Sequence, residues 1–168
     1  DVNCLALGTR WVITGRRDGT THVFDAQTGI DKHILPATKS AVRSVAINDP
    51  SQYFAVGTED GHVRLFHSEH RKLIKQWKAH SDSIEGMLFN TTKNILITGS
   101  LDHSLRIWNL TGNDYELLMT IKTNGPVIKT RSSHDGRLLA ALIENEFGIH
   151  LWDLDQLINN FKKLKLDW

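Results

Sequence analysis

The chain has 168 residues, of which 40% are hydrophobic and 23% charged, proportions that are ordinary for a globular domain. Its net charge of +1, from 20 Lys and Arg against 19 Asp and Glu, gives no general attraction to nucleic acid or to a membrane surface. The single cysteine, Cys4, excludes an internal disulfide bond and favours a reducing compartment, so a cytoplasmic location is expected.

The first two segments of the chain, about residues 1–37 and 38–79, are each predicted to form four strands. In the second segment, runs of β-branched and small residues alternate with turn residues. Its strands are expected at 42–47, 52–57, 62–66 and 72–77. Residues 59–61 are predicted to form a tight turn between the second and third strands, in which Gly61 can adopt a positive φ.

The third segment, about residues 80–123, repeats this pattern, whereas the fourth, about residues 124–153, departs from it. The fourth segment supplies three strands, which are expected at 127–132, 137–142 and 148–152. Because no strand pattern follows them, the last sheet is predicted to be three-stranded.

A helix is predicted at residues 154–166, because apolar residues recur there on one helical face. That face consists of Leu154, Leu157, Ile158, Phe161 and Leu164. Asp153 stands at the N-cap position and lysines gather near the C-terminal end, an order that suits the helix dipole. We expect the apolar face to cover the open side of the three-stranded sheet; a role for Phe161 and Trp168 in reaching a partner or membrane is the alternative.

The four segments are versions of one another. Their aromatic anchors Phe24, Phe66 and Trp108 are each 42 positions apart, and Trp152, which is followed by Asp153, comes 44 positions later. A strand-rich repeat of this length that ends in an aromatic–Asp pair resembles the WD-repeat β-propeller family. The resemblance implies an all-β fold of four-stranded antiparallel blades, within a ring of seven or eight blades.

The two ends of the chain suggest how it relates to such a ring. It begins without Met at an innermost strand and ends without a closing strand, so we expect the C-terminal blades of a larger propeller. Residues 151–154 and 161–168 are also similar to the C-terminal repeats of bacterial multidomain WD-repeat proteins. The rival interpretation is a half-ring, in which two copies associate to close an eight-bladed ring.

One group of polar residues in the third segment resembles the structural hydrogen-bond network of this family. It consists of His80, Thr98, Asp102 and Trp108. In such a network a carboxylate, an imidazole, a hydroxyl and an indole N–H satisfy one another inside the blade. The competing interpretation, a catalytic triad of His80, Asp102 and a nearby serine, is disfavoured because each group already has a structural role.

Other chemical sites are not supported by the sequence. His67 and His70 have undemanding spacing and no second ligand pair, so no metal is expected. Cys4, in an apolar strand, is expected to be an inert thiol. The segment from Gly15 to Gly19 has too few glycines for a phosphate-binding loop. We therefore expect neither a cofactor nor enzymatic activity.

In the family that the chain resembles, loops entering the first strands and turns after the second strands gather on one rim, where partners bind. The corresponding residues here are Arg16, Arg17, Lys39, Arg43, Glu59, Asp82, Glu85, His103 and Lys129. Their mixed charges suit a peptide with both charge signs better than a polyanion. The predicted function is a non-catalytic scaffold that binds other proteins or peptides, with no nucleic acid or membrane as partner. The alternative is the sensor or regulatory module of a signalling enzyme, a kinase or an NTPase, whose catalytic domain lies outside this chain.

Overall fold

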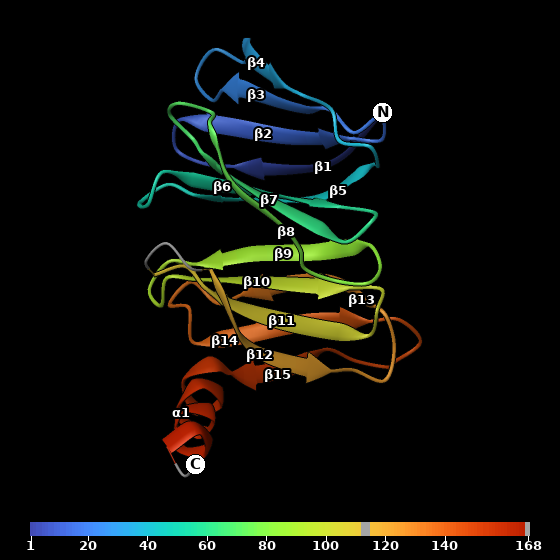
Figure 1. Ribbon diagram of the computed structural model, residues 1–168, viewed down its shortest axis with the longest axis vertical. Helices are drawn as coiled ribbons and strands as arrows, with labels where there is room; N and C mark the ends of the chain where they lie inside the picture. Colours follow the sequence, from blue (N-terminus) through green and yellow to red (C-terminus); the bar gives the residue numbers. More distant parts are fainter. Residues whose placement is uncertain (112–114, 167–168) are drawn as a thin grey trace.

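The computed structural model of the protein describes residues 1–111 and 115–166, which form four antiparallel sheets and one helix (Figure 1). The first sheet contains β1 (Val2–Leu7), β2 (Trp11–Arg16), β3 (Thr21–Asp25) and β4 (Asp31–Leu35). The second contains β5 (Val42–Asn48), β6 (Tyr53–Thr58), β7 (His62–His67) and β8 (Leu73–Lys78). In both sheets the strands are paired in the order in which they follow one another along the chain.

The third and fourth sheets continue this arrangement. The third contains β9 (Ile84–Asn90), β10 (Ile95–Ser100), β11 (Ser104–Asn109) and β12 (Glu116–Lys122). The fourth contains β13 (Val127–Ser132), β14 (Leu138–Ile143) and β15 (His150–Asp153), and the helix α1 (Leu154–Leu166) follows directly. The predicted all-β fold class, with a three-stranded last sheet and a C-terminal helix, is confirmed.

The last strand begins later than predicted. It starts at His150 and not at residue 148, because Gly148 adopts a φ of 125°, which is incompatible with a regular strand. The preceding turn also contains Asn145 in the left-handed region. The longer turn therefore absorbs residues that the sequence pattern assigned to the strand.

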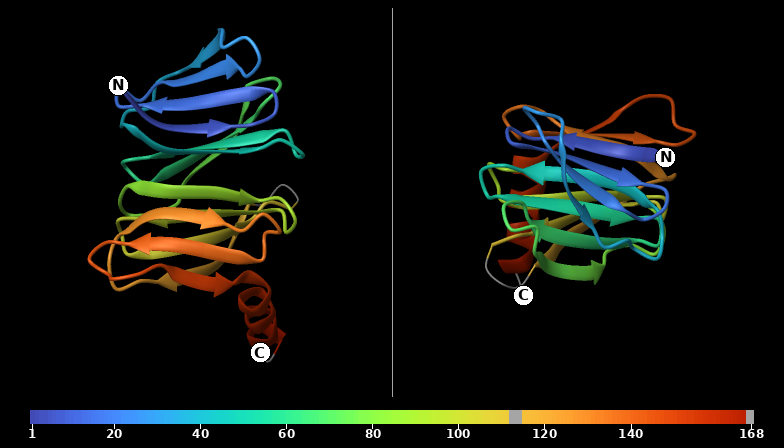
Figure 2. Two further views of the ribbon diagram at one scale, coloured as in Figure 1. Left: turned by 180° about the vertical axis from the view of Figure 1, so that it is seen from behind. Right: turned by 90° about the horizontal axis from the view of Figure 1, so that it is seen from above.

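The four sheets follow one another along the long axis of the molecule, with the N-terminal sheet at one end and α1 at the other (Figures 1 and 2). The first strands β1, β5, β9 and β13 are neighbours in that order. Three hydrophobic cores fill the spaces between successive sheets. Burying apolar area between sheets is what stabilises a repeat that cannot cover its own faces.

Glycines on the second strands allow neighbouring sheets to approach closely. A Cβ atom on Gly57 would lie 2.7 Å from Met87 Cε and 3.0 Å from Ile84 Cγ2, and would also collide with Ser44 Oγ. Gly15 and Gly99, one repeat before and after, face the first strands of the next sheets in the same way. A larger residue at these positions would push the sheets apart.

The turns after the second strands show the predicted glycine chemistry. Gly61 has a φ of 78°, which an L-residue adopts with difficulty. His103 occupies the same position in the third sheet with a φ of 61°. The third turn therefore holds a non-glycine residue in the left-handed region.

The helix is capped as predicted, and its apolar face packs against both the third and the fourth sheets. Asp153 Oδ1 accepts hydrogen bonds from the backbone N–H groups of Asp155 at 3.0 Å and Gln156 at 3.1 Å. Leu154, Leu157 and Ile158 pack into the core shared by the third and fourth sheets. This core includes Leu139 and Trp152 of the fourth sheet, but Leu151 on β15 stays exposed, so the helix covers the last sheet only in part. Of the residues named for this helix, Trp168 and the side chain of Leu164 lie outside the part that the structure describes.

Candidate functional site

The polar network of the third sheet connects four side chains in a chain of hydrogen bonds. His80 Nδ1 lies 3.0 Å from Asp102 Oδ2, and His80 Nε2 lies 2.7 Å from Thr98 Oγ1. Trp108 Nε1 donates to Thr98 Oγ1 at 3.0 Å. A neutral imidazole protonated at Nδ1 satisfies every group, because it donates to the carboxylate and accepts from the threonine hydroxyl.

Burial determines the protonation of this network. The side chain of His80 is 0% exposed, and this burial lowers its pKa, which the nearby Asp102 only partly offsets. Burial alone would raise the pKa of Asp102, but hydrogen bonds from Ser104 and Ser81 and the interaction with His80 hold it below its usual value. The network is therefore a neutral histidine beside an ionised carboxylate.

The serine nearest to this pair cannot act as an exposed nucleophile. Ser104 Oγ donates to Asp102 Oδ1 at 2.5 Å and lies 3.3 Å from His80 Nδ1. Ser104 is 0% exposed, so a substrate has no access to its hydroxyl. These hydrogen bonds connect the loop before β9 with β10 and β11. The arrangement is a structural network and not a catalytic triad.

The rim predicted from the sequence is assembled from backbone contacts. The loop before each first strand bonds to the turn after a second strand, as in Thr38 N to Gly19 O at 2.9 Å and Glu59 N to Ala41 O at 2.9 Å. Leu101 N and Ser83 O form the same contact in the third sheet at 3.0 Å. All these loops and turns therefore lie at the same end of the sheets.

Some of the predicted rim residues come together and others do not. Arg43 Nη2 lies 3.3 Å from Glu59 Oε2, and Arg43 Nε lies 3.9 Å from Glu85 Oε1. Arg16 and Arg17 lie at the end of β2 and in the turn after it, whereas Asp82 and His103 lie in the loop before β9 and the turn after β10. Lys39 lines a different pocket, described below.

The ion-paired Arg43 faces a groove along the first strands. This groove, of about 470 Å³, is lined by residues of β1, β5, β9 and β13, among them Arg43, Glu85 and Lys129. Arg131 also lines the groove and was not among the predicted rim residues. Its position two residues after Lys129 on β13 could have indicated it, because such residues point to the same face of a strand. Cys4 is half-buried at one wall, and burial raises the pKa of its thiol to about 11. The thiol is therefore unreactive near neutral pH.

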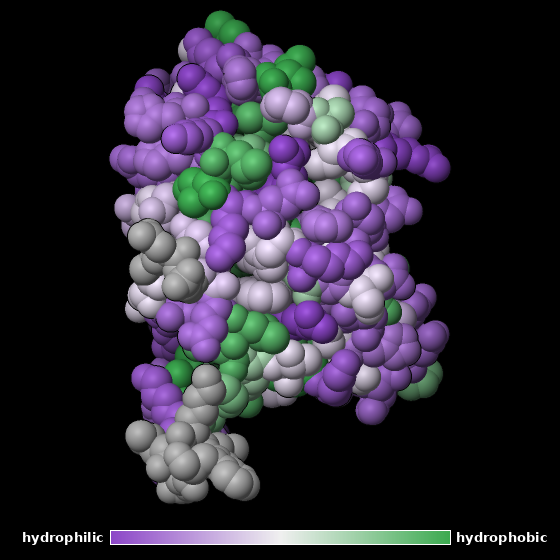
Figure 3. Space-filling view, viewed as in Figure 1, coloured by the Kyte–Doolittle hydropathy of each residue, from purple (hydrophilic) through white to green (hydrophobic). Residues whose placement is uncertain are grey.

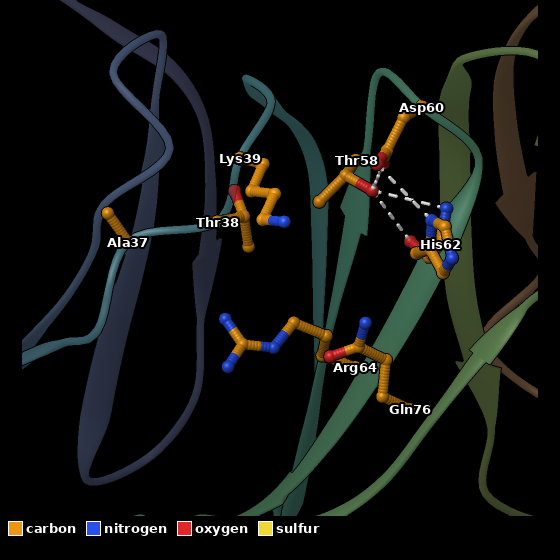
Figure 4. A pocket seen from close by; sticks show the side chains of 8 residues that line it. All are labelled: Ala37, Thr38, Lys39, Thr58, Asp60, His62, Arg64 and Gln76. Carbon is orange, nitrogen blue, oxygen red and sulfur yellow. Dashed lines mark hydrogen bonds and ion pairs between the residues drawn. The ribbon is translucent and has the colours of Figure 1, made fainter.

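A second pocket, of about 380 Å³, lies between the loop before β5 and the second sheet (Figure 4). Its lining consists of Ala37, Thr38, Lys39, Thr58, Asp60, His62, Arg64 and Gln76. Apart from Lys39, none of these was a predicted binding residue. The sequence did contain one indication that Arg64 has a defined place in the repeat. Arg64 and Arg106 are 42 residues apart and occupy equivalent positions on β7 and β11.

The histidines considered for metal binding have other contacts. The rings of His67 and His70 stack with centroids 4.8 Å apart, and Glu69 pairs with Arg10 at 2.6 Å. Within residues 1–111 and 115–166, no group of three or more His, Cys, Asp or Glu side chains could hold a metal ion. In the same part of the chain, the structure has no helix of sufficient length and apolar character to cross a membrane.

Comparison with known proteins finds WD-repeat proteins. A family model described as the anaphase-promoting complex subunit 4 WD40 domain matches residues 5–93. A p21-activated protein kinase-interacting protein 1-like of Gallus gallus is 22% identical over 152 residues, which are 90% of this chain and 40% of that protein. The U3 small nucleolar RNA-associated protein 21 homolog of Schizosaccharomyces pombe is 27% identical over 161 residues, 94% of this chain and 17% of that protein.

A solved structure shares the fold over most of the chain. The structure of U3-55K superimposes with a TM-score of 0.80 at 17% sequence identity, over 92% of this chain and 49% of that one. The chain thus spans less than half the length of these proteins.

Proposed function

This chain belongs to the WD-repeat β-propeller family, and from that premise we propose that it is a non-catalytic scaffold for protein–protein interactions. The observation that carries the proposal is the groove along the first strands, into which charged residues of both signs project from different sheets. Arg43 and Lys129 supply positive charge and Glu85 supplies negative charge. Such a surface favours a peptide that carries both signs, because charge complementarity selects a partner and its orientation.

The polar network of the third sheet supports a scaffold over an enzyme. Its buried groups bond to one another, so none of them is left to act on a substrate. The sequence-based expectation that nucleic acid is not a partner is not carried forward, because one relative is named for its association with a small nucleolar RNA. A cytoplasmic location and the alternative role as a module of a signalling enzyme stay predictions.

Affinity capture with quantitative mass spectrometry tests the scaffold role. Arg43→Glu combined with Lys129→Glu reverses charge in the groove, and Lys72→Glu makes a comparable change just before the outer strand β8. We expect a defined set of proteins to be retained by the wild type and by Lys72→Glu, and to be lost from the double variant. Retention of the same set by all three proteins would contradict binding in the groove.

A further inference from the structure

The pocket between the loop before β5 and the second sheet lies beside a position that a histidine occupies in the next repeat. Adding 42 to the numbers of its lining residues converts Thr38 to His80, Asp60 to Asp102 and Arg64 to Arg106. In the third sheet the imidazole of His80 is completely buried against Asp102. Thr38 is a smaller residue, and its hydroxyl donates to the backbone oxygens of Ser40 and Gly19. The pocket therefore lies beside the position that the imidazole takes in the third sheet.

The carboxylate of Asp60, which is equivalent to the Asp102 that pairs with His80, contacts other residues. Asp60 Oδ1 accepts a hydrogen bond from Thr58 Oγ1 at 2.5 Å, and Asp60 Oδ2 lies 3.3 Å from His62 Nδ1 (Figure 4). Its charge is thus directed toward one wall of the pocket. In Figure 4, Lys39 and Arg64 lie away from this group, on the opposite side and at the base.

Arg64 is a half-buried cation without a counter-ion. Its Nη1 donates to Pro36 O at 3.2 Å, its guanidinium lies 5.2 Å from the ring centre of Phe66, and its Nε is buried without a hydrogen-bond partner. None of the ion pairs found in the described part of the chain involves Arg64 or Lys39. Removing a cation from water without an opposite charge is unfavourable, so this arrangement is suited to an anionic ligand.

We propose that this pocket binds the phosphoryl group of a phosphorylated side chain in a partner peptide. The guanidinium of Arg64 offers a forked pair of donors, and Lys39 adds a second, mobile positive charge. Two cations match a phosphoryl dianion better than a single carboxylate. That the ligand is a peptide rests on the proposed scaffold function, and the position of Lys39 in a loop of the rim gives such a peptide access.

A titration followed by two-dimensional ¹H–¹⁵N NMR tests the proposal on the whole chain. The probe is the acetylated and amidated pentapeptide Ala-Ala-phosphoserine-Ala-Ala, and the same peptide with serine is the control. We expect saturable shifts of the amides of residues 38–39 and 58–64 with the phosphorylated peptide alone. Inorganic phosphate should bind more weakly; equal or tighter binding of inorganic phosphate would overturn the peptide as ligand.

Three single variants link the binding to the pocket. Lys39→Met, at an exposed position, should weaken the affinity about tenfold, as the loss of a charge-assisted contact predicts. Arg64→Met should weaken it at least as much. Arg106→Met removes the equivalent arginine of the third sheet, which donates to Ala79 O, and should leave the affinity unchanged.

Filling the pocket provides a test in the opposite direction. Thr38→His introduces an imidazole beside Asp60, as His80 lies beside Asp102 in the third sheet, so it should weaken binding by occupying part of the pocket. The proposal is overturned if the phosphorylated peptide gives no saturable shift, or if Lys39→Met and Arg64→Met both bind like the wild type. Such a failure leaves the scaffold function standing, because that function is tested at Arg43 and Lys129.

Discussion

Asp102 is the residue on which the polar network of the third sheet depends. Its carboxylate contacts the ring of His80, the backbone N–H of Ser81 and the hydroxyl of Ser104, which come from the loop before β9 and from the start of β11. The side chain is only 6% exposed, so water cannot replace these bonds. The equivalent aspartate of the second sheet, Asp60, is exposed, and Thr38 stands where the third sheet has His80.

We therefore expect Asp102→Ala to lower the free energy of unfolding by about 2–3 kcal/mol, because it leaves buried donors without an acceptor. Urea denaturation followed by tryptophan fluorescence measures the change. Asp60→Ala is the matched control, with a smaller loss expected. Equal stability of Asp102→Ala and the wild type would contradict a structural role for the network.

The lowered pKa of His80 predicts a dependence of stability on pH. The unfolded chain takes up a proton on this histidine below about pH 6.5, whereas the folded chain, with its lower pKa, does not. The unfolded state thus binds more protons, and the stability that the neutral histidine contributes is lost as the pH falls below about 6.5. The slope approaches at most about 1.4 kcal/mol per pH unit for one group.

The measurement is the free energy of unfolding at several pH values between 7.5 and 5. His80→Gln removes this titration, so its stability should change less over the same range. Parallel pH profiles of the two proteins would show that His80 titrates alike in the folded and unfolded states.

At the scale of elements, the close approach of β6 to the next sheet depends on the missing side chain of Gly57. Ser44, Ile84 and Met87 surround the position where a Cβ atom would lie. The equivalent glycines of the first and third sheets meet the first strands of the following sheets, so the feature belongs to the repeat.

Gly57→Ala should therefore destabilise the protein by about 1–3 kcal/mol through overpacking. Thermal and urea unfolding measure the loss. In the double variant with Ser44→Ala, the nearest colliding atom is removed, so the two losses should not be additive. Strict additivity would indicate that the collision is relieved elsewhere.

At the scale of the whole molecule, the two end sheets leave apolar side chains uncovered. Leu5 on β1 is 65% exposed and Leu151 on β15 is 64% exposed, at opposite ends of the row of sheets (Figure 1). Hydrophilic atoms cover most of the face seen in Figure 3, and its apolar atoms form separate patches, which lie over β3 and β4, over the upper part of β8 and beside the helix. The interior junctions between sheets, by contrast, are filled.

Because apolar area at the ends of a row of repeats favours association, we expect the 168-residue chain by itself to self-associate. Size-exclusion chromatography with light scattering gives the mass. A monodisperse dimer would support a closed eight-bladed ring of two copies, and larger aggregates would support a segment that needs further blades. Leu5→Glu with Leu151→Glu should favour the monomer, whereas Ile74→Glu on β8 should not. A wild type that stays monomeric at high concentration would contradict the expectation.

Local residue chemistry made most of the fold predictable. The 42-residue period located the strands to within one or two residues, and the turn glycines and the cap at Asp153 followed from their conformational preferences. The resemblance to the WD-repeat family implied that His80, Thr98, Asp102 and Trp108 bond to one another, and the structure contains these hydrogen bonds. The late start of β15 was missed, because alternation cannot show that Gly148 leaves the β region.

The sequence by itself thus determined the repeat and, through its resemblance to the WD-repeat family, the fold class and the polar network of the third blade. These features depend on neighbouring residues and on a regular period. Only the tertiary structure decided what lies between the blades. It placed the helix against the core of two sheets, paired Arg43 with Glu59 and Glu85, and left Arg64 without a carboxylate. The sequence shows that Thr38 stands where another blade has His80, but whether neighbours fill the vacated space depends on packing between sheets.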